Sequence, residues 1–341
     1  MKILVTGGAG FIGSHFVTSL ISGDIATPQP VTQVTVVDKL GYGGNLRNLA
    51  EASADPRFSF VRGDICDEGL IEGLMARHDT VAHFAAETHV DRSVVASGPF
   101  VASNLVGTQV LLDAALRHHI GRFLHVSTDE VYGSIDTGSW AEGHPLAPNS
   151  PYAASKAGSD LLALAYHQTH GMDVVVTRCS NNYGPRQFPE KMIPLFVTRL
   201  LDGLDVPVYG DGRNIRDWLH VSDHCRGLAL ALGAGRAGEV YHIGGGWEAT
   251  NLELTEILLE ACGARRSRIS FVTDRKGHDR RYSLDYSKIA GELGYRPRVD
   301  FTDGIAETVA WYRANRSWWT DGNRWADGRR SLPAIGVRGP S

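Results

Sequence analysis

The stretch MKILVTGGAGFIG (1–13) decides the fold of this chain. Its apolar run KILVT predicts a buried strand, and Gly7, Gly10 and Gly13 follow where a helix is expected to begin. Glycines at this spacing between a strand and a helix are typical of a dinucleotide-binding turn. The first permits the tight turn, the second lets the backbone approach a pyrophosphate, and the third allows the helix to pack closely on the sheet. The start of the helix supplies N–H donors and a positive dipole end to the anion.

The alternation of strand and helix continues through the first half of the chain. Apolar, β-branched runs predict strands at 2–6, 34–38, 58–62, 80–84, 122–127 and 173–178, and helices are expected at 11–22, 67–77, about 100–118 and about 151–170. Strands without polar alternation are buried on both faces, as in a parallel sheet, and the helices between them form right-handed crossovers. The pattern predicts an α/β fold with a Rossmann-type, doubly wound parallel sheet.

Asp38, at the end of the second predicted strand, indicates which dinucleotide binds. A carboxylate at this place accepts hydrogen bonds from the ribose hydroxyls and repels a 2′-phosphate, which favours NAD over NADP, although the neighbouring Lys39 weakens the charge argument. The spacing from Gly13 exceeds the usual ~20 residues, and the loop SGDIATPQPVTQ accounts for the excess. Asp64 and Ile65, after the third strand, are placed to meet the adenine, although an isolated Asp is also an ordinary turn residue.

The length of the chain predicts more than one lobe. A single core stops growing near ~250–300 residues, and this chain has 341. We expect an NAD-binding Rossmann domain at 1–180, to which some later segments return, and a smaller mixed α/β substrate lobe at 181–315, with helices at about 189–202 and 250–263. Residues 320–341 show little apolar periodicity and predict a loosely ordered tail.

Composition excludes several classes of protein. The net charge of −4 lacks the basic surplus of a nucleic-acid binder. No apolar run approaches the ~18–20 residues of a membrane span, and the N-terminus lacks the apolar core of a signal peptide. The four cysteines show no CxxC spacing and indicate reduced, buried thiols (Cys66, Cys179, Cys225 and Cys262). We therefore expect a cytoplasmic protein with no metal and with neither nucleic acid nor membrane as a partner.

Tyr152 and Lys156 in SPYAASK (150–156) are candidates for the chemistry. Ser150 is a natural N-cap and Pro151 suits the first helical position, so the pair is expected on one face of a helix. A phenol titrates near ~10, and a neighbouring ammonium favours the phenolate. A phenolate can take a proton from an alcohol while NAD takes the hydride. The alternative reading is a Tyr and a Lys on a solvated helix face.

These features resemble the extended short-chain dehydrogenase/reductase family over roughly residues 1–315. Most members, such as the nucleotide-sugar 4-epimerases, carry Ser or Thr without an acidic pair where this chain has STDEVYG (127–133). The sequence Thr128-Asp129-Glu130 resembles the dTDP-glucose 4,6-dehydratases of this family. The same resemblance is carried by FAAETHVDRS (84–93), SNNYGP (180–185), FPEKMIP (188–194), NIRDWLHVSDH (214–224) and DRKGHDRRY (274–282).

The resemblance implies a lyase with tightly held NAD that converts dTDP-glucose to dTDP-4-keto-6-deoxy-glucose for deoxysugar biosynthesis. Oxidation at C4 acidifies the C5 proton, water leaves across C5–C6, and the hydride returns to C6 while C5 is reprotonated. The family assigns the acid to Asp129 and the base to Glu130, and it places Thr128 on the C4 oxygen beside Tyr152. Two adjacent carboxyls push their pKa values apart, so one can stay protonated. Without the family strings, the same triplet would also suit a helix cap.

The resemblance also implies the ligand contacts. Cofactor contacts are implied for Gly7, Gly10, Phe11, Ile12, Gly13, Asp38, Lys39, Asp64, Ile65, Phe84, Ala85, Ala86, Thr88, Asn104, Tyr152, Lys156 and Asn182. Substrate contacts are implied for Glu87, Thr88, His89, Thr128, Asn181, Glu190, Lys191, Met192, Pro207, Val208, Tyr209, Arg216, Asn251, Arg275, His278 and Tyr282. Lys191, Arg216 and either Arg275 or His278 are expected at the pyrophosphate. Each of these residues alone would suit an ordinary polar surface.

Two further expectations come from the same source. Gly41 stands where the family usually has a Thr whose hydroxyl contacts the cofactor, so NAD is expected to be held slightly less tightly. Relatives dimerise through two long helices, which would be 100–118 and 151–170 here, and apolar residues on both are compatible with a homodimer or with an intramolecular core (Leu111, Leu112, Ala115, Leu161, Leu162 and Ala165).

Two other functions stay open from the sequence. One is a nucleotide-sugar 4-epimerase or decarboxylase of the same fold. These reactions eliminate no water and need no acidic pair. The other is a catalytically inactive, NAD-sensing scaffold, against which the intact set of candidate catalytic residues argues.

Overall fold

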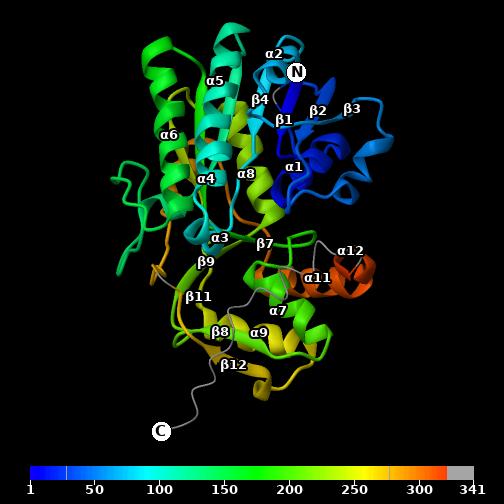
Figure 1. Cartoon of the computed structure of the whole chain (residues 1–341), viewed down its shortest axis with the longest axis vertical. Coiled ribbons are helices and arrows are strands. Elements are labelled where there is room, and N and C mark those ends of the chain that lie inside the picture. Colours follow the sequence, from blue (N-terminus) through cyan, green and yellow to red (C-terminus); the bar gives the residue numbers. More distant parts are fainter. Residues whose placement is uncertain (28, 276, 321–341) are drawn as a thin grey trace.

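The computed structural model describes residues 1–320 with the exception of residues 28 and 276, and Figure 1 shows two lobes stacked along the long axis. The tail predicted at 320–341 lies outside the described residues except for its first residue. The upper lobe, which we call the sheet lobe, contains a parallel sheet of seven strands in the order β10-β6-β5-β4-β1-β2-β3. The strands are β1 (Lys2–Thr6), β2 (Gln33–Asp38), β3 (Phe58–Arg62), β4 (Thr80–His83), β5 (Arg122–Thr128), β6 (Val174–Cys179) and β10 (Val240–Ile243).

This topology confirms the predicted doubly wound parallel sheet. The strand order reverses between β1 and β4, and in such sheets the crevice at the carboxyl ends of the strands beside this point is where ligands bind. The seventh strand, β10, comes from residues 240–243 and pairs with β6, so part of the later chain returns to the sheet. The boundaries at 180 and 315 between the two lobes stay a prediction.

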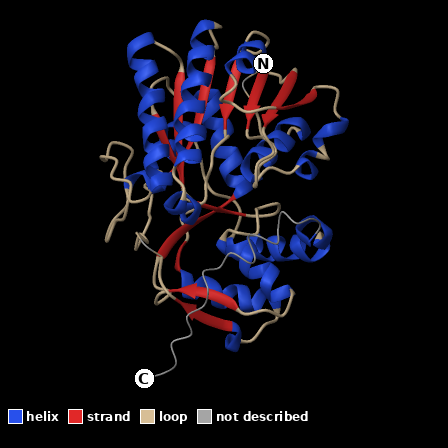
Figure 2. Cartoon of the chain, in the orientation of Figure 1, coloured by secondary structure: helices blue, strands red, loops and turns tan. Residues whose placement is uncertain are grey.

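Helices cover both faces of the sheet (Figure 2). One face carries α2 (Glu68–Met75), α5 (Gly107–Arg117) and α6 (Pro151–His170), and the other carries α1 (Phe11–Ser22), α8 (Val221–Ala234) and α10 (Ser287–Leu293). Ile3 and Val5 of β1 pack into the core beneath α1 and α8, whereas Leu4 packs into the core on the opposite face. Burial of both faces explains why the strand sequences are continuously apolar.

The helix that carries Tyr152 begins and ends at the residues predicted for it. The Ser150 hydroxyl accepts a hydrogen bond from the backbone N–H of Ala153 at 3.1 Å, and Pro151 occupies the first helical position. Gly171 follows the helix with φ +68°, the left-handed conformation that favours glycine. The helix α6 therefore spans Pro151–His170.

The helix predicted at about 100–118 is less regular than expected. It starts as α4 (Gly98–Phe100), passes through the π-helical segment η3 (Val101–Val106) and continues as α5, and the short helix α3 (Val90–Val95) precedes it. Among the described residues, Gly98–Arg117 is the one helical stretch long and apolar enough to cross a membrane, which the sequence analysis did not expect. Of its most apolar window, 56% is buried inside the protein, as for a core helix, so it is weak evidence of a span. Location in the cytoplasm stays a prediction.

The lower lobe, which we call the small lobe, has its own core. Its sheets have the orders β11-β9-β7 and β12-β8, and its elements are β7 (Asn181–Tyr183), α7 (Met192–Leu201), β8 (Val206–Tyr209), β9 (Ile215–His220), β11 (Glu248–Thr250), α9 (Asn251–Cys262), β12 (Ile269–Val272), α11 (Phe301–Ala314) and α12 (Arg316–Thr320). An aromatic cluster that includes Trp311, Tyr312 and Trp318 joins the last two helices. Short 3₁₀ helices complete the described chain at η1 (Leu46–Leu49), η2 (Ala52–Ala54), η4 (Asp129–Tyr132) and η5 (Arg266–Arg268).

Candidate active site

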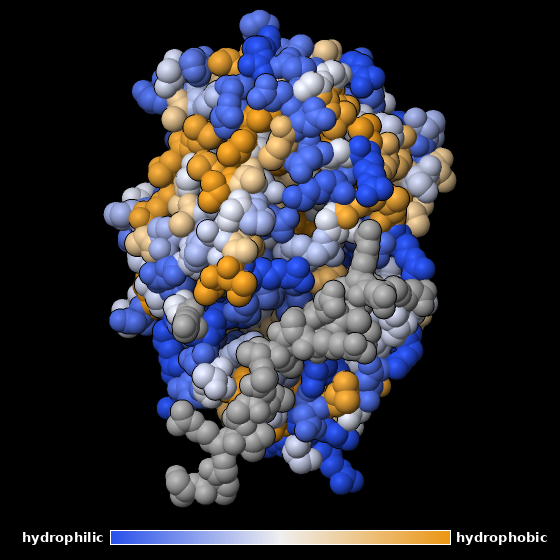
Figure 3. Space-filling model, in the orientation of Figure 1, coloured by the Kyte–Doolittle hydropathy of each residue, from blue (hydrophilic) through white to orange (hydrophobic). Residues whose placement is uncertain are grey.

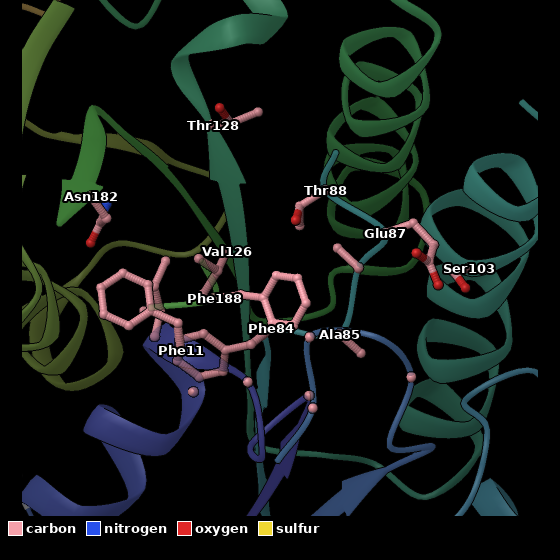
Figure 4. A pocket seen from close by; sticks show the side chains of 18 of the residues that line it. Phe11, Phe84, Ala85, Glu87, Thr88, Ser103, Val126, Thr128, Asn182 and Phe188 are labelled. Carbon is pink, nitrogen blue, oxygen red and sulfur yellow. The ribbon is translucent and has the colours of Figure 1, made fainter. Parts of the chain in front are cut away.

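A cavity of about 300 Å³ opens at the carboxyl ends of the strands, beside the point where the strand order reverses. The glycine turn, the ends of β2, β4 and β5, the start of α6 and the segment 179–191 all contribute to it. Figure 4 shows Phe11, Phe84 and Phe188 gathered on one side, with Glu87 and Ser103 on another. All five candidate catalytic residues line this cavity.

The glycine turn has the geometry expected of a dinucleotide site. Gly7 has φ +67°, and a Cβ placed there would lie 2.6 Å from backbone atoms of Ala85. At Gly13 a Cβ would lie 2.5 Å from the carbonyl oxygen of Gly7. Gly10 caps α1 without a side chain, so the first N–H groups of the helix face the cavity without a capping side chain in the way. The turn therefore fits a pyrophosphate.

Asp38 is held in place by backbone donors. Its Oδ2 accepts a hydrogen bond from the N–H of Ala9 at 3.0 Å, and its Oδ1 accepts one from the N–H of Leu40 at 2.8 Å. Burial raises the pKa of this carboxyl, and these two hydrogen bonds oppose the rise. The Nζ of the neighbouring Lys39 donates to Ser103 Oγ at 2.8 Å and lies 3.2 Å from a carboxylate oxygen of Glu87.

Tyr152 and Lys156 are both buried at the cavity floor, with exposed fractions of 6% and 4%. The Lys156 Nζ donates to the carbonyl oxygen of Val126 at 2.8 Å. Burial raises the pKa of Tyr152 well above 10.0, Glu130 and Cys179 raise it further, and a hydrogen bond with Thr128 lowers it. Burial dominates this shift, and the predicted lowering of the pKa by the Lys156 ammonium is not among its causes.

The acidic pair follows β5 directly and differs in environment. The Thr128 hydroxyl caps η4 by accepting a hydrogen bond from the N–H of Glu130 at 3.3 Å, and it donates to Asp129 Oδ1 at 3.2 Å. Burial raises the pKa of Asp129 well above its usual 3.8, and the neighbouring Glu130 raises it further. Burial also raises the pKa of Glu130, but positive charges on Lys191, Arg216 and Arg275 lower it. The pair is arranged so that Asp129 holds a proton more readily than its neighbour.

Some predicted contacts line the cavity and others lie beyond it. Those that line it include every predicted cofactor residue except Asn104, together with Glu87, Thr88, Thr128, Asn181, Glu190 and Lys191 from the predicted substrate residues. Asn104 is buried behind the cavity, where its side chain bonds to the backbone of Glu87 and to Ser155 Oγ. The predicted substrate residues outside the cavity are His89, Met192, Pro207, Val208, Tyr209, Arg216, Asn251, Arg275, His278 and Tyr282.

Several of the outlying residues form a cationic and aromatic cluster in the small lobe. The Arg216 guanidinium lies over the ring of Tyr282 at 4.2 Å, and that of Arg275 lies over the ring of Tyr209 at 5.3 Å. The rings of Tyr209 and His278 meet edge to face at 6.4 Å. The positive charges of Arg216 and Arg275 lower the pKa of Glu130, so the cluster lies within electrostatic reach of the acidic pair.

The sequence analysis missed several residues that line the cavity. Tyr42 and Phe188 meet with ring centroids 5.6 Å apart, and Ser103, Gln187 and Cys179 also line the cavity. Tyr42 follows Gly41, and Gln187 precedes the string FPEKMIP (188–194). Nothing in the local sequence pattern distinguishes either residue from an ordinary loop residue. The remaining missed lining residues are Val37, Gly43, Gly44, Gly63, Val126, Ser127 and Ser180.

The donor set suits an organic ligand. Asp129 Oδ2, Asn181 Oδ1 and Glu190 Oε1 are buried without a hydrogen-bond partner among the described residues. Within residues 1–320, apart from 28 and 276, no group of three or more His, Cys, Asp or Glu residues could hold a metal ion.

The thiols are free, but only Cys179 and Cys225 are buried, whereas Cys66 and Cys262 are partly exposed, so the prediction of four buried thiols was half wrong.

Known proteins similar to this chain include dehydratases of nucleotide sugars and, at lower identity, a 4-epimerase. Residues 4–308 match the family model described as GDP-mannose 4,6 dehydratase. A dTDP-glucose 4,6-dehydratase from Actinoplanes sp. is 99% identical over 94% of this chain and 100% of its own length. The crystal structure of a dTDP-glucose 4,6-dehydratase from Streptomyces venezuelae with NAD and TYD bound is 62% identical, with a TM-score of 0.92 over 94% of this chain and 99% of that one. A UDP-glucose 4-epimerase from Thermotoga maritima is 33% identical, with a TM-score of 0.84 over 92% of this chain and 99% of that one.

Proposed function

We propose that this protein is a hydro-lyase that converts dTDP-glucose to dTDP-4-keto-6-deoxy-glucose with NAD, because the chain belongs to the dTDP-glucose 4,6-dehydratase family. The product is a precursor for deoxysugar biosynthesis. The solved relative with 62% identity holds NAD, and the glycine turn and Asp38 of this chain fit the same cofactor. When bound, NAD accepts a hydride from C4 of the sugar and later returns it to C6.

The single observation that carries the proposal is the acidic pair beside Tyr152. Asp129 is 2% exposed and has a pKa well above its usual value, so it is suited to donate a proton at neutral pH. Glu130 faces the positive charges of Lys191, Arg216 and Arg275, which favour its ionised form and suit it to accept a proton. Elimination of water needs an acid and a base together, whereas epimerisation at C4 needs neither of these two groups.

Each residue on the cavity floor then has one task. Tyr152 takes the proton of the C4 hydroxyl, and Thr128 holds the C4 oxygen beside it. The C4 ketone acidifies the C5 proton, which Glu130 removes, and Asp129 protonates the departing C6 hydroxyl. C5 regains a proton when the hydride returns to C6. Lys156 is held by the carbonyl of Val126, and its ammonium form would favour the Tyr152 phenolate, although burial lowers the pKa of Lys156. Burial raises the pKa of Tyr152, and the positive charge of an oxidised nicotinamide ring, when bound, would favour the phenolate.

The cationic cluster of the small lobe is proposed to bind the diphosphate. Arg216, Arg275 and Lys191 come from separate segments and converge electrostatically on Glu130. Guanidinium groups match the geometry of phosphate oxygens and form charge-assisted hydrogen bonds with them. Tyr209 and Tyr282, which stack on these guanidiniums, are proposed to border the nucleoside.

A homodimer is proposed through the outer face of α3, η3 and α6. Figure 3 shows apolar residues gathered over this part of the sheet lobe, and Val95, Val101, Val106 and Leu161 are exposed there, Leu161 by 57%. Leu111, Leu112 and Ala115 cannot contribute, because all three are buried in the core of a single chain. Leu162 packs partly against that core, which leaves Leu161 and Ala165 from the original set on the outer face.

Incubation of the purified protein with dTDP-glucose tests the function. The expected product develops the alkali-induced absorbance of a 4-keto-6-deoxy sugar and has lost the mass of one water. UDP-glucose, offered in parallel, measures how strongly thymidine is preferred. Formation of dTDP-galactose without loss of water would instead support the epimerase, and no change in any nucleotide glucose would support the inactive scaffold.

A further inference from the structure

The last described helix of the small lobe reaches the glycine turn of the sheet lobe through one buried amide. Asn48 lies in η1 and is 1% exposed. Its Nδ2 donates to the carbonyl oxygen of Ala9, inside the glycine turn, at 3.0 Å. Its Oδ1 accepts from the indole N–H of Trp318 in α12 at 2.9 Å. In Figure 1, α12 lies directly below the sheet lobe.

The backbone around Asn48 strengthens this connection. The carbonyl oxygen of Asn48 accepts from the Arg186 guanidinium at 3.2 Å, so two segments of the small lobe hold the same residue. The neighbouring Arg47 also donates from its guanidinium to the carbonyl oxygen of Ser317 at 3.1 Å. These contacts fix the position of η1 between α12 and the glycine turn.

Ala9 passes the constraint to the ribose-binding carboxylate. Its carbonyl oxygen accepts a second hydrogen bond, from the N–H of Asn45 at 2.9 Å, and its own N–H donates to Asp38 Oδ2 at 3.0 Å. Rotation of the peptide at Ala9 would therefore disturb both Asp38 and the adjacent Gly10, which caps α1. The chain of contacts runs from Trp318 through Asn48 and Ala9 to Asp38.

We propose that Asn48, oriented by Trp318, is a positioning residue that holds the glycine turn in its NAD-binding conformation and so slows release of the cofactor. The proposal rests on the proposed function, because it takes NAD as the occupant of the cavity. It makes cofactor retention depend on a helix of the small lobe that contributes no residue to the cavity.

The rate of NAD release tests this proposal. Enzyme loaded with labelled NAD is chased with excess unlabelled NAD, and the bound label is followed with time. Asn48→Ala and Trp318→Phe should each release NAD about tenfold faster, which corresponds to about 1.4 kcal/mol and lies in the range for leaving a buried hydrogen-bonding group without its partner. The double variant should release NAD no faster than Asn48→Ala alone, because Trp318 acts through Asn48.

Trp319→Phe is the matched control. Its indole N–H donates to the carbonyl oxygen of Tyr312 at 2.8 Å within the small lobe, so the substitution also removes a buried indole hydrogen bond but does not reach η1. It should release NAD at the parent rate. Melting temperatures of the variants separate a local effect from general loss of stability, and Trp318→Phe covers the case in which Asn48→Ala does not fold.

The outcomes are distinct. Equal release rates for Trp318→Phe and Trp319→Phe would overturn the proposal, as would additive effects in the double variant. If the parent enzyme captures no labelled NAD, the cofactor assignment itself is wrong, and the positioning role of Asn48 falls with it.

Discussion

Two regions of the cavity hold their ligands by different physical means. The reaction floor consists of four buried side chains and the partly buried Glu130, and their protonation decides what they do (Thr128, Asp129, Glu130, Tyr152 and Lys156). The dinucleotide cradle, made of residues 7–13, 38–48 and the contacts of Asn48, is built from backbone groups and one carboxylate held by fixed hydrogen bonds. Changes in the floor should therefore remove chemical steps, whereas changes in the cradle should weaken binding of the cofactor and leave the steps intact.

The largest effect is expected in the floor. Tyr152→Phe should lower turnover by at least ~10²-fold, the range for removal of a general base, because no other group can then accept the C4 proton. Single-turnover kinetics with dTDP-glucose measure it. Tyr166→Phe, in the same helix but with its phenol bonded to Asp113 outside the cavity, should keep the parent rate. Near-native turnover in Tyr152→Phe would remove this residue from the mechanism.

The next effect is expected in the cradle. Asp38→Ala should weaken NAD about tenfold and raise the relative tolerance for NADP, because the carboxylate no longer bonds to the ribose hydroxyls or repels a 2′-phosphate. Dissociation constants of the two dinucleotides, measured on cofactor-depleted protein, check both parts. Turnover at saturating NAD should stay within a few-fold of the parent. An unchanged preference would mean that Asp38 does not meet the ribose.

A smaller effect concerns a histidine that supports the cavity lining through Asn182. His224 is fully buried behind Asn182, to whose Oδ1 its Nδ1 bonds at 2.9 Å. Burial lowers the pKa of His224 from 6.5 to about 3. In the unfolded chain the ring gains a proton below about pH 6.5, but in the folded chain it stays neutral, so its contribution to stability is present above pH 6.5 and is lost as pH falls toward 3.

Urea unfolding of His224→Gln at two pH values tests this sign. The stability lost by the substitution should be about 1.4 kcal/mol smaller at pH 5.5 than at pH 7.5, which is one pH unit of linkage for one group. Equal losses at both pH values would show that the folded ring titrates normally.

The smallest effect is expected at Gly41 in the cradle. A Cβ atom placed there would meet side-chain carbons of Lys39 at 3.6 and 3.9 Å, which is ordinary contact, so Gly41 has room for the first atom of a Thr side chain. One added hydrogen bond, worth about 0.5–1.5 kcal/mol, should slow NAD release a few-fold to about tenfold. The labelled-NAD chase measures the gain, and Gly41→Ala separates the hydroxyl from the loss of glycine flexibility. No gain over Gly41→Ala would mean that the hydroxyl does not reach the cofactor.

The two regions also differ in how well the sequence predicts them. Tyr152 and Lys156 could be placed together because Ser150 and Pro151 define the start of one helix and its register. The bond from Trp318 to Asn48 joins residues 270 apart in sequence, and no local pattern indicates it. The fold followed from β-branched runs and glycines, but the π-helical segment Val101–Val106 has no comparable signal.

Burial decides points that the sequence could not. Leu111 and Leu112 form an apolar helix face whether they meet a second subunit or their own sheet, and only the three-dimensional structure shows the sheet. The Lys156 ammonium was expected to lower the pKa of Tyr152, but the sequence does not reveal how completely the phenol is buried. Spacing predicts which residues are neighbours along an element, and tertiary packing decides how much water they keep.

In the proposed mechanism the acidic pair serves the elimination of water and is not needed for oxidation at C4. Asp129→Asn keeps the size of the side chain but cannot donate a carboxyl proton, and Tyr152 and Lys156 remain to support oxidation at C4. Glu130→Gln should likewise stall the reaction after oxidation, because it cannot remove the C5 proton. Glu142→Gln, a partly buried carboxyl with a raised pKa outside the cavity, serves as the control and should behave like the parent.

A single-turnover trace of NADH absorbance, with mass analysis of the quenched sugar, tests this claim most directly. We expect Asp129→Asn and Glu130→Gln to accumulate NADH and a 4-ketoglucose nucleotide that has not lost water, while product forms slowly. Dehydration at the native rate in both variants would contradict the account, since the pair would then be only structural. Absence of any NADH in both would contradict the division of roles, since the carboxyls would then act before C4 is oxidised.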